Sequence, residues 1–292
     1  MSRKLHKFQT VAEYQAYSAS TDYTTPCVAV VEENNVIYYD YGNNKPQVDL
    51  SDYKGEFQES SVGGDKYGKS AITKINYIPN GITSLGDAFS NLTSLEEVTC
   101  NIPDSVTILN STFYNCPSLV NAPVIPSGVT DIAYIFYGCS SIVNAPEIPN
   151  SITSMRNTFY NCTSLVKAPV IPSSVTNMNS TFYGCSSLVN APVIPSGVTN
   201  MFYTFHECRS IVKSPDIPSG VTRMEQTFSF CSSLKEVTLL PTTPPTYMQA
   251  LDSCPKLESI YVPDSAVSAY KTATGWSQFA SKIKPLSSKP SE

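Results

Sequence analysis

The sequence is poor in charge, in tryptophan and in histidine. Only 15% of its 292 residues are Asp, Glu, Lys or Arg, the formal net charge is −5, and it has one Trp and two His. This charge balance argues against a strongly basic nucleic-acid-binding protein, and a hydrophobic content of 41% argues against a disordered chain. No apolar run approaches the roughly 18 residues that a membrane-spanning helix needs.

Motifs that carry catalysis or bind cofactors are also missing from the sequence. It has no P-loop, GxGxxG, HExxH, GxSxG or EF-hand loop, and its nine cysteines contain no CxxC pair. The opening MSRKLHKFQTVAEYQAY has basic residues but no apolar stretch, so we do not expect a secretory signal there. We therefore expect no enzymatic activity, no cofactor, no metal site, no nucleic-acid partner and no membrane span.

A repeat of 23 residues organises most of the chain. Its unit is IPxSVTxMxxTFYxCxSLVxAPx, with about eight copies between residues 72 and 262. The cysteines of the repeat are Cys116, Cys139, Cys162, Cys185, Cys208, Cys231 and Cys254. The phenylalanines in the same register are Phe113, Phe136, Phe159, Phe182, Phe205 and Phe228. Both series are predicted to form ladders in a buried core.

A fixed period of this length is typical of a solenoid, because one unit cannot bury its apolar face without stacking on a neighbour. Phe, Cys and Leu at i, i+3 and i+6 fit one or two turns of helix or a tight coil. Prolines such as Pro169 remove a backbone donor from every coil, so the Leu-Val-x-Ala-Pro segment is a poor strand. We place the better strand at Val-Thr-x-Met, where the β-branched Val-Thr pairs lie.

The pattern IPxSVTxIxxxxFxxCxSL resembles the BspA-like branch of leucine-rich repeats over about two-thirds of the chain. The ending YVPDSAVSAYKTATGWSQFASKIKPL is similar to the closing helix that follows many such arrays. The resemblance implies surface display, adhesion and protein binding, and it names no ligand. The middle units depart from the family in having Ala-Pro where an apolar strand residue is usual.

The ends of the chain do not follow the repeat. A capping box of Thr10 and Glu13 predicts a short helix at TVAEYQAYSA, and CVAVV and VIYY predict a β-hairpin. This opening also resembles N-terminal segments of proteins from gut Bacteroidales and their phages, which implies an attachment module. The expected fold is a leucine-rich-repeat solenoid with a small α+β N-terminal module and a C-terminal capping helix. Its predicted parts are the attachment module 1–43, a linker 44–70, the solenoid 71–262, a helical cap 263–285 and a loose tail 286–292.

The candidate binding residues form a row one position after the core phenylalanines. One position beyond a buried residue on a helical turn is rotated by about 100°, so these rings are expected to be half exposed. The row consists of Tyr114, Tyr137, Tyr160, Tyr183 and His206. Aromatic rows can bind glycans or proteins, and the alternative is that each ring only packs on the next. Cys27 and Cys100 lie outside the cysteine ladder and are the candidates for exposed thiols.

Three classes of function are compatible with these features to different degrees. The first is a phage virion protein, a head or tail fibre or decoration, whose N-terminus attaches to a virion protein while the solenoid binds a host cell-surface protein or glycan. The second is a bacterial cell-surface adhesin of the same repeat family. The third is an intracellular scaffold or an enzyme, for which the sequence has no positive feature. The surface between Asn101 and Leu234 holds 11 charged residues in 134, which is also compatible with homo-oligomers formed by lateral packing.

Overall fold

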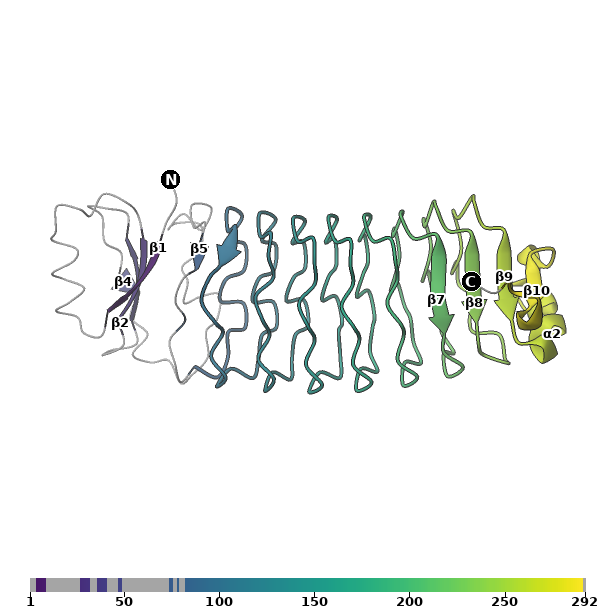
Figure 1. Ribbon diagram of the computed structural model, residues 1–292, viewed down its shortest axis with the longest axis horizontal. Helices are drawn as coiled ribbons and strands as arrows, with labels where there is room; N and C mark the ends of the chain where they lie inside the picture. Colours follow the sequence, from purple (N-terminus) through teal and green to yellow (C-terminus); the bar gives the residue numbers. More distant parts are fainter. Residues whose placement is uncertain are drawn as a thin grey trace. The chain divides into compact units, whose positions relative to one another are not determined.

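The computed structural model describes residues 4–8, 27–31, 36–40, 47–48, 74–75, 78 and 82–290 (Figure 1). The chain divides into two compact units, Met1–Ile142 and Val143–Glu292. They are called the first and the second unit below, and each is described by itself.

The first unit begins with a four-stranded sheet of order β1-β2-β3-β4. Its strands are β1 (Lys4–Phe8), β2 (Cys27–Val31), β3 (Val36–Asp40) and β4 (Gln47–Val48). β2 and β3 pair antiparallel at the position of the predicted hairpin, β1 joins β2 in parallel, and β4 joins β3 antiparallel. β4 lies inside the range predicted as a linker. The helix predicted at TVAEYQAYSA lies outside the described residues.

Tight turns, and not a helix, form the Phe-Cys-Leu segment of each coil. Two residues of every such segment, four positions apart, have left-handed backbone angles, for example Asn157 and Asn161 with φ of 54° and 56°. A helix cannot continue through left-handed residues, so the tight coil is the correct one of the two sequence-based alternatives. Successive N–H groups then alternate in direction. The Phe159 N–H donates to the Thr181 carbonyl of the next coil at 2.9 Å, whereas the Thr158 N–H closes a turn on Met155 at 3.2 Å.

The strand prediction at Val-Thr-x-Met is wrong. On that side of the coils the described residues form only isolated β-bridges, such as the one between Asn177 and Asn200. The described strands of the second unit lie in the segment that contains Ala-Pro in the middle coils, and they are β7 (Lys213–Ile217), β8 (Glu236–Leu239), β9 (Ser259–Val262) and β10 (Ile283–Pro285). They form one parallel sheet of order β10-β9-β8-β7, seen side by side in Figure 1. The last coils replace Ala-Pro with sequences such as Glu-Val-Thr-Leu, which restore the backbone donors that proline removes.

In the first unit, the equivalent segment of two coils forms a parallel strand pair that is only two residues long. There β5 (Lys74–Ile75) pairs in parallel with β6 (Glu97–Val98), and a 2.6 Å ion pair joins Lys74 to Glu97. In the middle coils of the second unit, single bridges from Asn144 to Lys167 and from Lys167 to Asn190 replace the ladder.

The core is built from stacked phenylalanine rings. Phe159, Phe182, Phe205 and Phe228 are all 0% exposed, and in this order their neighbouring ring centroids are 5.7, 5.6 and 5.4 Å apart with nearly parallel planes. Phe113 and Phe136 stack in the same way in the first unit at 5.9 Å. Identical coils place identical rings over each other, so every internal ring is covered on both faces.

The ladder cysteines are hydrogen-bond donors as well as buried side chains. Sγ of Cys208 lies 3.0 Å from the carbonyl oxygen of Phe182, in the coil before it. The same contact joins Cys185 to Phe159, Cys231 to Phe205 and Cys254 to Phe228, each at 3.1 Å. A parallel row of buried threonines does the same, with Thr204 Oγ1 donating to Met178 O at 3.1 Å. Both rows tie neighbouring coils together where the tight turns leave carbonyl groups inside the protein.

Burial also disfavours the reactive thiolate form, because it raises the pKa of Cys208 and Cys231 well above the usual range and that of Cys254 to about 11. Cys100, one of the two candidates for an exposed thiol, is half-buried, and burial raises its pKa to about 11. At pH 8, Cys100 is then a thiolate in only about one protein molecule in a thousand.

We therefore expect thiol labelling of the native protein at pH 8 to be slow at Cys100 and at every ladder cysteine. Mass spectrometry of trypsin fragments after labelling measures this, and urea-unfolded protein, in which all nine cysteines react, is the control. Rapid native labelling of several ladder cysteines would contradict the stacked core.

The closing segment is less helical than the sequence indicates. Its helix α2 covers only Val267–Thr272, and short 3-10 turns follow at Ser277–Phe279 and Leu286–Ser288. Ile283, predicted to lie in the helix, is the first residue of β10. The helix ends at Ala273, whose backbone is extended with ψ of 143°, and two residues later Gly275 takes a left-handed φ of 80° where a Cβ would lie 2.5 Å from the Tyr247 ring.

Candidate functional site

Two tyrosines of the predicted row stack on the second unit. Tyr160 and Tyr183 each follow a buried phenylalanine and precede a left-handed residue, which turns their rings outward. Their centroids lie 4.2 Å apart with planes 6° from parallel, and Tyr183 is half-buried. In the first unit, Tyr114 and Tyr137 stack at 4.6 Å and 11°. Within each pair, stacking covers the ring faces that the two tyrosines turn toward each other, so a ligand would contact ring edges and hydroxyl groups.

His206 continues the row but is not available for binding. It stacks on Tyr183 at 4.5 Å, packs against the edge of Phe230 at 5.4 Å, and is only 4% exposed. Burial lowers the pKa of His206, and the Glu207 carboxylate 3.7 Å from Nε2 opposes this in part. The prediction of His206 as an accessible binding residue is therefore wrong.

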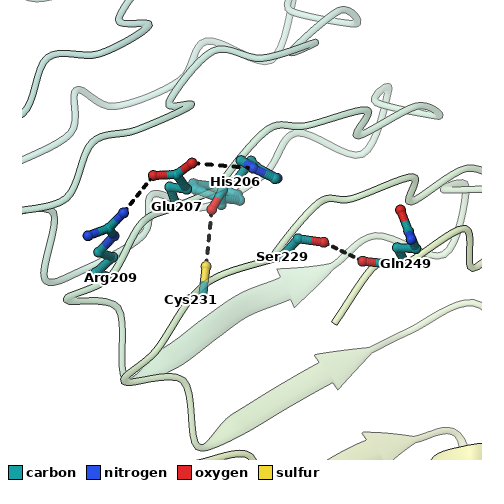
Figure 2. Close-up of polar contacts among 7 residues, drawn as sticks. His206, Glu207, Arg209, Ser229, Cys231 and Gln249 are labelled. Carbon is teal, nitrogen blue, oxygen red and sulfur yellow. Dashed lines mark hydrogen bonds and ion pairs between the residues drawn. The ribbon is translucent and has the colours of Figure 1, made fainter. Parts of the chain in front are cut away.

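Figure 2 shows the polar side chains around this end of the row. The Glu207 carboxylate lies between His206 and Arg209, and it accepts a 2.8 Å bond from the Arg209 guanidinium. Ser229, which takes the next place in the row, is buried and donates its hydroxyl to the Gln249 carbonyl. The row of exposed rings therefore ends before His206.

Sequence reasoning missed two exposed phenylalanines, Phe202 and Phe230, and the half-buried Tyr203. Phe202 is 37% exposed and packs edge-on against Tyr203 at 4.3 Å, while Phe230 is 49% exposed. Tyr203 and Phe230 have left-handed angles, and Phe230 stands at a position where the other coils have Asn, Gly, Ser or Glu. The signal for Phe230 was a single aromatic residue at this position, but a search for repeated residues discards such exceptions.

An open cleft lies beside Phe230, where the last turns meet the closing segment. It has a volume of about 810 Å³, and its lining includes Arg209, Phe230, Asp252, Gln278 and Phe279. At one end Arg209 is paired with Glu207, and at the other Asp252 accepts a hydrogen bond from the Tyr247 hydroxyl at 2.8 Å. Two aromatic side chains with a few fixed polar groups are typical of small-molecule and glycan sites.

Two further kinds of site were sought among the described residues. Among residues 74–75, 78 and 82–290, no three His, Cys, Asp or Glu side chains are grouped as a metal site requires. In the same part of the chain, no helix has the length and apolar character needed to cross a membrane.

Comparison with known proteins identifies the family. The model of the BspA type leucine rich repeat region matches residues 60–189 and 156–277, with six copies of the repeat. The chain therefore belongs to the BspA-type leucine-rich repeat family. No curated protein matches it.

Several solved structures are similar to the chain. A leucine rich cell surface protein of Faecalibacterium prausnitzii is 24% identical with a TM-score of 0.47, and the match covers 70% of this chain and 64% of that protein. The leucine-rich repeat protein of T. pallidum is 27% identical with a TM-score of 0.45, over 56% of this chain and 72% of its own. One from Eubacterium ventriosum is 20% identical with a TM-score of 0.42, over 72% and 71%. The chain thus spans about two-thirds of the length of these proteins.

Proposed function

We propose that this BspA-type repeat protein is a non-enzymatic binding protein whose solenoid recognises a protein or glycan on a bacterial cell surface. The observation that carries the proposal is the stacked, half-buried pair Tyr160 and Tyr183, with the exposed Phe230 and its cleft on the same unit. The thiols and hydroxyls that repeat in every coil hold the backbone together, as the bond from Cys208 to Phe182 illustrates. Because these thiols and hydroxyls serve the fold, they support a binding role over a catalytic one.

The weak charge of the solenoid supports a particular mode of binding. At the cleft beside Phe230, Arg209 is already paired with Glu207, and Asp252 accepts a hydrogen bond from Tyr247. A neutral glycan or an uncharged stretch of protein can contact these groups without breaking the Arg209–Glu207 ion pair. Affinity would come from ring contacts and short hydrogen bonds, with little electrostatic steering.

We further propose that the protein belongs to a phage particle, as a head or tail fibre or decoration. The N-terminal resemblance to segments from Bacteroidales phages supports this, and so does the sheet β1 to β4, which is built from residues outside the repeat and would serve as the attachment element. The alternative is a bacterial cell-surface adhesin, which the family membership favours. In both versions residues 1–43 attach the chain and the solenoid is displayed.

Protein composition of purified particles tests the two versions. We expect mass spectrometry to find the full chain in phage particles propagated on the host, and a 44–292 variant to be lost from them while remaining folded. Recovery of the chain from the washed cell surface of uninfected bacteria would favour the adhesin. A 44–292 variant that is incorporated normally would contradict an attachment role of the N-terminus.

A further inference from the structure

Two aromatic rings line the cleft beside Phe230 without touching each other. Phe230 packs against His206 at 5.4 Å, and Phe279 packs against Tyr247 at 5.8 Å. Within the part of the chain that the structure describes, neither phenylalanine has a second ring contact. Phe230 is 49% exposed, and Phe279 is half-buried. Both rings therefore keep surface that a ligand can contact inside the cleft.

The polar groups of the cleft include donors and acceptors that the chain itself does not use. Among the described residues, Arg209 makes one side-chain bond, from Nη2 to Glu207, so its other N–H groups are left for a ligand (Figure 2). Asp252 accepts the Tyr247 hydroxyl through Oδ1, which leaves Oδ2 as an acceptor. Ser232 is exposed in the lining, and its hydroxyl can both donate and accept.

Such a mixture of groups matches a sugar. Each hydroxyl of a sugar donates one hydrogen bond and accepts others, so a sugar needs partners of both kinds. The C–H groups on the faces of a pyranose ring form apolar surface, which suits the exposed part of an aromatic ring. An anion would need donors alone. A peptide that binds by strand addition would need a free strand edge, and the lining consists of turns and of the 3-10 turn Ser277–Phe279.

The charges of the cleft favour a neutral sugar over an acidic one. Arg209 is the one cation of the described lining, and Glu207 already pairs with it. Asp252 has only the neutral Tyr247 hydroxyl as its partner. An acidic sugar would have to share Arg209 with Glu207 or place its carboxylate near Asp252, and like charges that meet disfavour an association. A neutral sugar requires neither.

Ring contacts connect the cleft to the tyrosine pair. Tyr160 stacks on Tyr183 at 4.2 Å, Tyr183 stacks on His206 at 4.5 Å, and His206 meets the edge of Phe230. Neighbouring coils in a parallel stack are about 4.8 Å apart. One sugar unit adds a similar length to an extended glycan chain, so one chain can contact the cleft and the tyrosine pair together.

We propose that the cleft is a subsite for a neutral pyranose residue of a glycan chain that continues over Tyr183. Phe230 and Phe279 contact the apolar faces of this sugar, while Arg209 and Asp252 bond its hydroxyl groups. The inference rests on the proposed binding function and selects the glycan from its two classes of ligand.

Calorimetric titration of the full chain with neutral pentasaccharides of glucose, mannose, galactose and xylose tests the subsite. We expect at least one to bind, and Ser232→Trp to weaken it by about tenfold or more, because the added ring fills the cleft. Met248→Trp is the matched control, since Met248 is 61% exposed, lies outside the lining and receives the same ring. Both variants should melt like the parent. Phe279→Ala should also weaken binding.

Salt and an acidic probe test the neutral class. Raising the NaCl concentration from about 50 to about 500 mM should change the affinity by less than about twofold, because a neutral sugar forms no ion pair that salt could screen. A pentamer of galacturonic acid should bind more weakly than the neutral pentasaccharide. An acidic pentamer that binds more tightly than every neutral one would overturn the neutral class.

The remaining outcomes separate this inference from the proposed function. Binding that Ser232→Trp leaves intact, or that Met248→Trp weakens equally, overturns the cleft as the subsite. If no neutral pentasaccharide binds, the glycan inference is overturned. Binding to bacterial cells that protease treatment then abolishes would keep the proposed function, with a protein as the ligand. A chain that binds neither pentasaccharides nor cells would overturn both.

Discussion

Replacing Phe159 by alanine is expected to lower the free energy of unfolding by about 3–5 kcal/mol, the range for deleting a buried aromatic side chain. The ring is 0% exposed and stacks on Phe182 at 5.7 Å, and the Phe159 carbonyl accepts the thiol of Cys185. The cavity would lie between rigid coils that cannot close over it, so the loss should fall in the upper part of the range. Urea unfolding followed by far-UV circular dichroism measures it.

The neighbouring residue provides the matched control. Tyr160→Ala removes a ring that stacks on Tyr183, and the loss expected for an aromatic pair of this kind is about 0.5–1.5 kcal/mol beyond the buried area. Equal losses for Phe159→Ala and Tyr160→Ala would show that the tyrosine is part of the core, and Tyr160 would then no longer be a candidate for recognition.

Removing residues 263–292 is expected to make the protein aggregate. This segment contains Trp276, which is 0% exposed and donates its indole N–H to Pro245 O at 2.8 Å, and Tyr270, whose hydroxyl donates to Pro241 O at 3.0 Å. Without it, the apolar end of the last coil around Leu257 and Ile260 is open to solvent, together with the edge of β9. Light scattering after size exclusion measures the aggregation.

A point variant separates the loss of the cap from the loss of chain length. Trp276→Ala keeps all 292 residues and should cost about 3–5 kcal/mol, because the ring packs edge-on against Tyr247 at 5.2 Å and Tyr270 at 5.4 Å. A 1–262 fragment that stays monomeric and melts like the full chain would show that the closing segment does not cap the solenoid.

The 23-residue spacing was sufficient to predict which side chains form ladders, because identical coils must place identical residues over one another. It could not distinguish a helix from consecutive tight turns, since both bring i, i+3 and i+6 together. The left-handed Asn157 and Asn161 decide between them, and their positions hold Tyr, Glu or Gly in other coils. The bond from Cys208 to the Phe182 carbonyl was also not predictable, because a buried cysteine has the same sequence signature as a small apolar residue.

The candidate site was predictable only in part. Tyr160 and Tyr183 were found because they repeat, whereas Phe230 was missed because it interrupts a pattern of small residues. His206 was taken for a tyrosine equivalent, but the edge of Phe230 in the next coil covers its ring. Whether a side chain is covered by the next coil depends on residues that depart from the repeat, such as Phe230, and a consensus sequence does not record them.

Cell binding by the double variant Tyr160→Ala/Tyr183→Ala tests the central claim most directly. The fluorescently labelled full chain, the double variant and Met248→Ala as an exposed control are titrated onto intact cells of a panel of gut Bacteroidales and onto immobilised neutral glycans. The account predicts that the parent and Met248→Ala bind at least one of these alike, and that the double variant stays folded but binds about tenfold more weakly or worse. A folded double variant that binds as well as the parent would contradict recognition by the tyrosine row.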